Sequence, residues 1–177
     1  AVQRAAVALD DPQHHKHAVL RRGLGEQRDL GPVHRDGRVV IELVLGAALR
    51  RAKRRIALLT GLADLGGVWA LEEVTMAITR LADNAVHLSF VALVGDEIRR
   101  GKLPGMQADD AVAAAGMVAL AMGKMGAGEL NYSSDIDLIC LFDDGRFAGD
   151  DVQEARASFI KVVRRMTAML SDLTSDG

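Results

Sequence analysis

Several features that support common functions are scarce in this chain. Aromatic side chains make up only 3% of its 177 residues, which argues against the stacking surface that single-stranded nucleic acids require. The formal net charge is −2, so charge gives no reason to expect a nucleic-acid or membrane partner. No stretch reaches the roughly 18 uninterrupted apolar residues of a membrane span. We therefore expect no nucleic acid and no membrane among the partners.

Cysteine is also scarce, because Cys140 is the only one and no internal disulfide can form. It lies in an apolar run, where a free cysteine packs as a small apolar residue, which is typical of a cytoplasmic protein. Apolar residues nevertheless reach 49%, so the chain can bury a core of aliphatic side chains.

Residues 1–46 are predicted to be a poorly defined N-terminal segment. The apolar run 39–45 suits either a strand or the start of a helix. A histidine cluster lacks cysteine or carboxylate at ligand spacing, so a solvated loop is favoured over a metal site. The chain starts without methionine and stops just past a predicted helix, so we expect a fragment of a longer protein. The histidines are His14, His15 and His17. The candidate helices and strands of this segment are interrupted by Gly23, Gly25, Gly31, Pro32 and Gly37.

Residues 47–105 are predicted to be a helical region. Helices are expected at 47–66 and 71–99, because apolar residues recur at steps of three and four. The first helix has a basic face, for which a solvated surface is favoured over a partner-binding one. Its apolar positions are Leu49, Ile56, Leu59, Ala63 and Leu65, and its basic positions are Arg50, Arg51, Lys53, Arg54 and Arg55.

Residues 106–177 are predicted to begin a small sheet. Strands are expected at 117–122 and 135–142, joined by a loop with room for one helical turn. A turn at 143–145 then leads to a helix at 152–173. The fold class is therefore α+β, with a helical region followed by the start of a mixed sheet and flanking helices.

Two aspartates open the second of these strands. Asp135 and Asp137 are two residues apart, so they share one face of a strand, while Ile136 and Leu138 point to the other face and the core. Aspartate is disfavoured in strands, so a pair on one face needs a reason. The glycines before it fit neither a phosphate-binding P-loop, nor a dinucleotide fingerprint, nor an EF-hand.

Paired carboxylates beside a small-residue loop suit nucleotidyl transfer. Asp135 and Asp137 would hold Mg²⁺, which neutralises charge on a reacting phosphate. Gly126 and Ala127 would let exposed backbone N–H groups approach that phosphate closely. Ser133 and Ser134 would either donate to phosphate or orient the aspartates, and Lys124 suits either a phosphate contact or a surface position at the end of the strand. The rival interpretation is a glycine turn before a strand whose aspartates merely face water.

Residues 123–138 read Gly-Lys-Met-Gly-Ala-Gly-Glu-Leu-Asn-Tyr-Ser-Ser-Asp-Ile-Asp-Leu. This run closely resembles the nucleotidyltransferase motif of the bacterial glutamine synthetase adenylyltransferase family, whose bifunctional members are also called adenylyl-removing enzymes. The upstream segments 49–55 and 63–75 are similar to that family as well. The resemblance covers about residues 47–177.

The resemblance implies a nucleotidyltransferase-type sheet and an activity on glutamine synthetase. The Asp-Ile-Asp wording resembles the N-terminal half, which removes AMP from a tyrosine by phosphorolysis and releases ADP. Implied partners are glutamine synthetase, phosphate, ADP or ATP, and a nitrogen-signalling regulatory protein. Two alternatives stay open: ATP-dependent attachment of AMP, and a non-catalytic regulatory or docking module.

The chain departs from the family pattern in two places. The usual Gly-Gly pair is Gly126-Ala127 here, which puts the loop geometry in question because alanine does not adopt the left-handed backbone freely. Family sites use a third carboxylate on a later strand, and the chain stops at Gly177 before such a strand. We therefore expect this fragment to have little or no activity alone.

Overall fold

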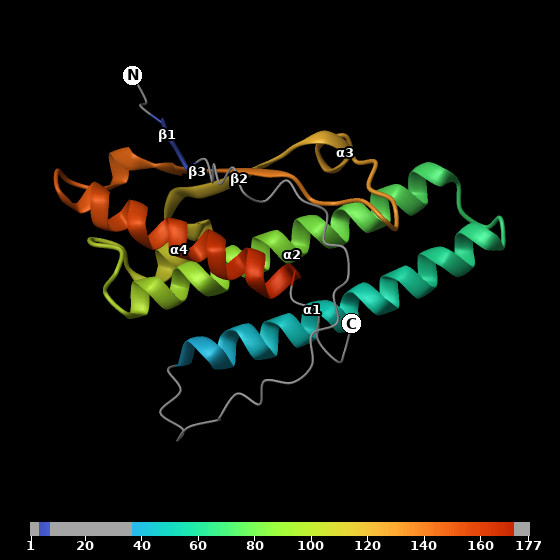
Figure 1. The fold of residues 1–177 in the computed structure, drawn as a ribbon, viewed down its shortest axis with the longest axis horizontal. Coiled ribbons are helices and arrows are strands. Elements are labelled where there is room, and N and C mark those ends of the chain that lie inside the picture. Colours follow the sequence, from blue (N-terminus) through green and yellow to red (C-terminus); the bar gives the residue numbers. More distant parts are fainter. Residues whose placement is uncertain (1–3, 8–36, 172–177) are drawn as a thin grey trace, which may run out of the picture.

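A computed structural model describes residues 4–7 and 37–171, with side chains from residue 40 onward. It confirms the α+β class, since long helices pack against a small antiparallel sheet (Figure 1). The predicted division at 46 and 105 stays a prediction, and the histidine cluster lies outside the described residues. The elements in chain order are β1 (Arg4–Val7), α1 (Gly37–Leu65), α2 (Leu71–Arg99), η1 (Ala108–Gly116), β2 (Met117–Ala121), α3 (Gly123–Gly126), β3 (Leu138–Asp143), η2 (Asp144–Arg146) and α4 (Asp151–Ser171).

Helices α1 and α2 form an antiparallel hairpin. Helix α4 lies across the half of the hairpin that contains the start of α1 and the end of α2 (Figure 1). The bounds of α2 match the prediction, whereas α1 starts at Gly37 rather than at residue 47, so the apolar run 39–45 is helical. The predicted apolar face of α1 is wrong at Leu59 and Leu65, which are 58% and 91% exposed. The reason is that the far end of the hairpin extends beyond α4.

Helix α2 is the centre of the fold. It contacts α1, η1 and α4, and Leu93 and Val94 near its C-terminal end are fully buried. Within the described residues, it is the one helix whose length and composition would suffice to cross a membrane, and 44% of its most apolar stretch is buried inside the protein. Its contacts are those of the core helix of a globular fold.

The sheet has the order β1-β3-β2, and both pairings are antiparallel. Cys140 and Phe142 of β3 are buried beneath it, and the Phe142 ring lies 4.9 Å from that of Phe159 in α4. The other face of the sheet carries exposed Leu120 and Ile139, which are register partners. One face is therefore packed and the other is open.

Strand β3 begins at Leu138, and the prediction of a strand from residue 135 is wrong at that end. Met122 N–H donates to Asp137 O at 2.9 Å, which prolongs the β2–β3 pairing by one step. The pairing cannot continue further, because α3 starts at Gly123 and turns the neighbouring chain away. The expected helical turn in this loop is confirmed by α3.

Element η1 was not predicted from the sequence. Its Ala114 and Ala115 are buried and have φ angles of 49° and 50°, in a region that alanine rarely adopts. The surrounding packing against α2 holds them there. This bend brings the chain from the end of α2 into β2.

A buried ion cluster joins the three long helices. The Arg165 guanidinium of α4 contacts Glu42 of α1 at 2.6 Å, and Asp96 and Glu97 of α2 at 2.8 and 2.9 Å. Lys161 also contacts Glu97, at 3.0 Å. Burial lowers the pKa of Arg165, but hydrogen bonds and charges from Glu42 and Asp96 outweigh it and raise this pKa above its ordinary value.

Candidate functional site

The glycine turn after β2 is built against the backbone of that strand. Gly126 N–H donates to Met122 O at 3.2 Å, and a Cβ on Gly126 would lie 2.5 Å from Ala121 O. Only glycine fits such a contact. Ala127 has φ −83° and ψ −8°, which is ordinary right-handed backbone. The replacement of the usual second glycine by alanine therefore introduces no strain.

The N–H groups of this loop are already paired within the chain. Ala127, Gly128 and Glu129 donate to the carbonyls of Gly123, Met125 and Lys124 at 3.1, 3.1 and 2.7 Å. Leu130 N–H donates to Thr79 Oγ1 of α2 at 3.2 Å. A phosphate at this site would therefore meet side-chain donors, such as the exposed ammonium group of Lys124, rather than a cradle of these N–H groups.

Asn131 organises the two serines, and the sequence analysis did not single it out. Its Oδ1 accepts from Ser133 N–H at 3.2 Å, from Ser133 Oγ at 3.3 Å and from Ser134 Oγ at 2.7 Å. Ser134 Oγ in turn accepts from Asn131 N–H at 3.0 Å. Asparagine two residues before a serine is a recognisable turn signal, and it could have identified this role.

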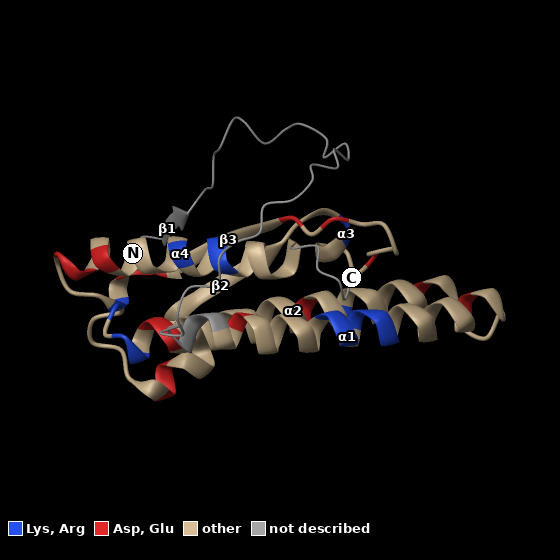
Figure 2. Ribbon diagram, turned by 60° about the horizontal axis from the view of Figure 1, so that its bottom comes forward, with Lys and Arg blue, Asp and Glu red and all other residues tan. Residues whose placement is uncertain are grey.

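Asp135 and Asp137 lie in the segment between this turn and β3, and both are exposed. The side chains of Ser134 and Ile136 line a cavity on one side of the segment, and those of the two aspartates do not. Their absence from the cavity lining agrees with the expectation that the two carboxylates share the opposite side of the segment, which stays a prediction because β3 begins only at Leu138. Figure 2 shows acidic residues along the chain between α3 and β3.

The neighbours of the aspartate pair differ in part from the prediction. Leu138 packs against the core as expected, but Ile136 is 41% exposed and lies at the edge of the cavity rather than in the core. Ser134 lines that cavity as well. Its expected contact with phosphate stays a prediction.

The aspartate pair fits a magnesium ion that is completed by other oxygens. Mg²⁺ in proteins is usually held by one or two carboxylates together with water and substrate phosphates. In the described part of the chain, no group of three or more His, Cys, Asp or Glu residues could hold a metal. Asp143 is not a third member, because its carboxylate accepts from Gly145 N–H at 3.2 Å and contacts Arg146 at 3.7 Å.

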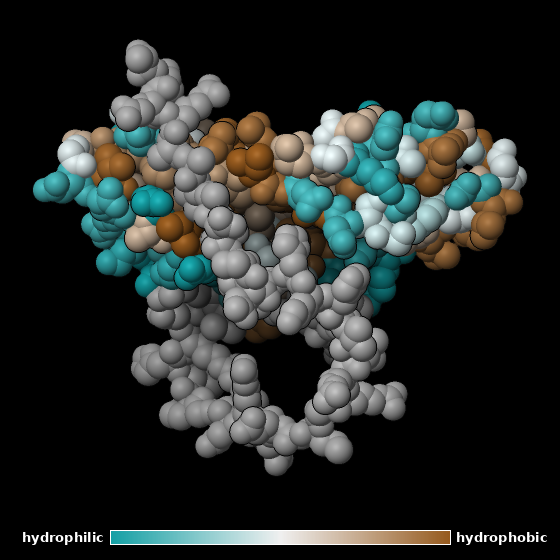
Figure 3. Space-filling view, turned by 45° about the horizontal axis from the view of Figure 1, so that its top comes forward, coloured by the Kyte–Doolittle hydropathy of each residue, from teal (hydrophilic) through white to brown (hydrophobic). Residues whose placement is uncertain are grey.

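An apolar surface adjoins the aspartates. Asp137 and Ile139 follow the same side of the chain, and Ile139 is the register partner of Leu120. Figure 3 shows apolar surface over β2 and β3, and again at the far end of the α1–α2 hairpin. Two carboxylates on the chain that enters a strand, after a glycine turn and beside an open sheet face, are features of the nucleotidyltransferase class.

Comparison with known proteins identifies the family within that class. The family model for glutamate-ammonia ligase adenylyltransferase matches residues 37–177. The chain is 44% identical over 129 residues to the bifunctional glutamine synthetase adenylyltransferase/adenylyl-removing enzyme of Bradyrhizobium sp. (strain BTAi1 / ATCC BAA-1182). It is 42% identical over 130 residues to that of Xanthobacter autotrophicus (strain ATCC BAA-1158 / Py2). The chain therefore belongs to the glutamate-ammonia ligase adenylyltransferase family.

These alignments cover only a small part of the relatives. They include 73% of this chain and 13% of the Bradyrhizobium and Xanthobacter proteins. No solved structure matches the chain.

Proposed function

We propose that this chain carries the aspartate pair of a centre that removes AMP from a tyrosine of glutamine synthetase. The relatives are named for both attachment and removal of the adenylyl group. The observation that carries the proposal is the placement of Asp135 and Asp137, exposed together on the chain that enters β3. The sequence Asn-Tyr-Ser-Ser-Asp-Ile-Asp favours removal of AMP over attachment of AMP.

The reaction is an in-line displacement at phosphorus. An oxygen of inorganic phosphate attacks the phosphorus of the AMP–tyrosine diester, and the bond from phosphorus to the tyrosine oxygen breaks. The products are ADP and tyrosine, whose phenolate oxygen takes up a proton. The chain's task is to position the reactants and to balance the negative charge that develops on the phosphate oxygens.

Each residue of the site has a distinct part in this proposal. Asp135 and Asp137 would hold Mg²⁺, which supplies positive charge that stabilises the reacting phosphate. Lys124 would contact phosphate as a point charge. Ser133 would add a hydroxyl, and the fixed turns at Gly126 and Ala127 would set the distance between Lys124 and the carboxylates. Ser134 would act through Asn131 by fixing the turn that precedes Asp135.

The same proposal includes the protein substrate, the small molecules and the regulator of the reaction. Glutamine synthetase would be the protein substrate, as in the names of the relatives. Phosphate would be the small reactant and ADP the released nucleotide, and a nitrogen-signalling protein would regulate the reaction in the cytoplasm.

A chimaeric enzyme tests the direction of the reaction. Residues 37–177 of this chain would replace the matching segment of the Bradyrhizobium relative, whose name gives it both activities. Removal is measured as phosphate-dependent ADP release from AMP-modified glutamine synthetase, and attachment as pyrophosphate release from ATP. We expect the Asp135→Asn/Asp137→Asn change to abolish ADP release and to leave attachment intact.

The attachment activity serves as the control for folding in that experiment, and Asp150→Asn, a change at an exposed loop aspartate, serves as the matched control for charge. Loss of attachment with retention of removal would assign this segment to the opposite reaction. Retention of both activities in the double variant would support a docking module without a catalytic role.

A further inference from the structure

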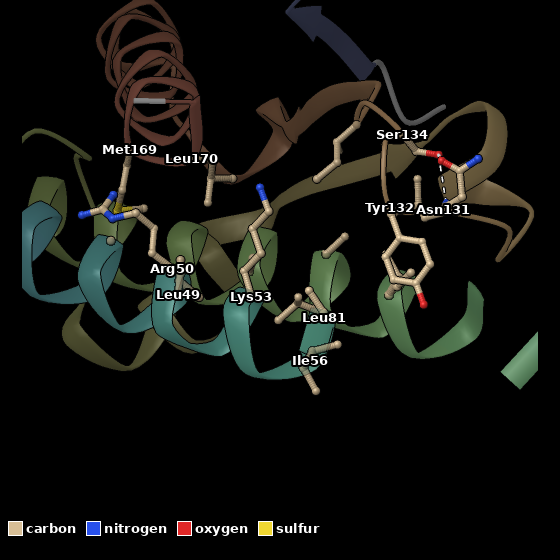
Figure 4. Close-up of a pocket in the computed structure, with 17 residues that line it drawn as sticks. Leu49, Arg50, Lys53, Ile56, Leu81, Asn131, Tyr132, Ser134, Met169 and Leu170 are labelled. Carbon is tan, nitrogen blue, oxygen red and sulfur yellow. Dashed lines mark hydrogen bonds between the residues drawn. The ribbon is translucent and has the colours of Figure 1, made fainter. Parts of the chain in front are cut away.

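A cavity of about 210 Å³ adjoins the aspartate-bearing segment, and neither Asp135 nor Asp137 lines it. Its floor is apolar and is supplied by α1, α2 and the end of α4, including Ile78, Leu81 and Leu170. Its wall is the chain that leads to the aspartates, including Tyr132, Ser134 and Ile136. Figure 4 shows these groups around one space above α1.

Two cations from α1 line this cavity. Lys53 rises from α1 into the space between Leu170 and the segment that carries Ser134 (Figure 4). The Arg50 guanidinium lies beside Met169, since both would approach a Cβ on Gly46 at 3.2 Å. Arg50 Nε is buried and lacks a hydrogen-bond partner among the described residues.

No acidic side chain among the described residues balances the charge of this cavity. None of its lining residues is acidic, and neither Arg50 nor Lys53 forms an ion pair within the described residues. Other cations of the fold, such as Arg165 and Lys161, are by contrast paired with carboxylates. A buried Arg50 Nε without a partner, together with the exposed Lys53 and an apolar floor, favours an anion with an apolar body.

We propose that this cavity binds a small organic anion, whose carboxylate or phosphate contacts Lys53 and Arg50 and whose apolar part lies on the α2 floor. The volume equals that of about seven water molecules at ~30 Å³ each. It is smaller than the roughly 300–1,000 Å³ of pockets for drug-sized ligands. The ligand is therefore a compact molecule with a short carbon chain.

Such a ligand would contact the same short segment that carries the two aspartates. Ser134 and Ile136 line the cavity, and they alternate with the two aspartates along the same few residues of chain. An occupant would fix the position of this segment, and with it the spacing of the carboxylates. The anion is accordingly a regulatory ligand, and its binding is independent of which reaction the aspartates serve.

Nuclear magnetic resonance titration of the 177-residue chain tests the proposal without metal or nucleotide. Hexanoate is the probe, and hexylammonium is its partner of equal length and opposite charge. We expect hexanoate to shift the backbone resonances of Lys53, Ser134 and Ile136 saturably, with a dissociation constant in the millimolar range. Hexylammonium is expected to leave them unchanged.

Variants locate the binding. Lys53→Gln is expected to weaken hexanoate binding by about tenfold, whereas Arg51→Gln, an exposed position of the same helix outside the cavity, leaves it unchanged. Ala85→Leu fills the cavity floor and is expected to abolish binding, with circular dichroism showing that the fold is retained. The proposal is overturned if hexanoate does not bind saturably, if hexylammonium binds as well, or if folded Lys53→Gln binds normally.

Discussion

At the scale of single residues, glycine at position 126 is required by contact rather than by backbone angle. Its missing Cβ would meet Ala121 O at 2.5 Å, and that oxygen belongs to the backbone of β2. Gly61 near the C-terminal end of α1 differs, since a Cβ there would meet nothing within 4 Å. The two glycines form a matched pair for one substitution.

We expect Gly126→Ala to lower the free energy of unfolding by about 1–3 kcal/mol, because β2 or α3 must move to admit the methyl group. Gly61→Ala is expected to raise it by about 0.5–1 kcal/mol through higher helix propensity. Urea denaturation of both variants measures these changes. Equal effects of the two substitutions would contradict the close packing of Gly126 on β2.

The buried thiol of Cys140 gives the stability a dependence on pH. Burial raises the pKa of this thiol above its ordinary value, so above the unfolded-state pKa the folded chain retains a proton that the unfolded chain loses. Stability therefore falls as the pH rises from the unfolded towards the folded pKa.

The Cys140→Ala variant isolates this effect from other titrating groups. The free energy of unfolding of the unaltered chain is expected to fall relative to that of the variant above pH ~8.5, with a slope of at most about 1.4 kcal/mol per pH unit. Urea denaturation between about pH 7 and pH 10 measures the difference. A constant difference across that range would show that the thiol ionises equally in both states.

At the scale of elements, the spacing of apolar residues predicted those helices and strands that depend on local sequence. The bounds of α2 agree, and β2, α3 and α4 occur where they were expected. The run 39–45 had been left open between a strand and the start of a helix, because it is apolar on several sides and lacks a helical stripe, and the structure shows it as helix. The late start of β3 was missed because strand pairing depends on where the neighbouring chain turns, at Gly123.

Thr79 ties α2 to the loop before the aspartates, since it accepts a hydrogen bond from the buried Leu130 N–H. Thr79→Val leaves that N–H unsatisfied, and we expect a loss of about 1–3 kcal/mol in the free energy of unfolding and faster hydrogen exchange at Leu130. Thr75→Val is the control, because Thr75 Oγ1 donates only to Glu72 O of its own helix. Its expected effect is within about 0.5 kcal/mol.

Arg165 holds α4 to α1 and α2, and its loss would leave buried carboxylates short of positive charge. Glu97 is fully buried and Asp96 is 5% exposed. We expect Arg165→Met to lower the free energy of unfolding by about 3–5 kcal/mol. The neighbouring exposed Arg164→Met is expected to change it by no more than about 0.5 kcal/mol. Thermal and urea denaturation of the two variants check this, and similar effects would show that the ion cluster contributes little.

At the scale of the whole molecule, the fold places two different surfaces on one short segment. Residues 134–137 carry the two exposed aspartates, and Ser134 and Ile136 of the same segment line a cationic cavity above α1. The spacing of the aspartate pair could be found in the sequence, whereas the shared side of its carboxylates stays a prediction, because β3 begins only at Leu138. The cavity could not be predicted, because Arg50 and Lys53 are far from Ser134 in sequence, and only the packing of α1 and α2 brings them together.

The sequence motif identifies candidate site residues but not their hydrogen-bond partners. Gly126, Asp135 and Asp137 could be singled out from sequence, but the pairing of the loop N–H groups with the chain's own carbonyls required coordinates. The hydrogen bond from Ser134 Oγ to Asn131 Oδ1 likewise required coordinates.

The central claim is that Asp135 and Asp137 hold a divalent cation together. Paramagnetic Mn²⁺, used in place of Mg²⁺, broadens nuclear magnetic resonance signals near its binding site. For the 177-residue chain, we expect broadening centred on residues 134–138 and on Met122 and Gly123, which Asp135→Asn/Asp137→Asn removes and Asp150→Asn preserves. Broadening centred on Asp143 and Asp144, or unchanged in the double variant, would contradict the account.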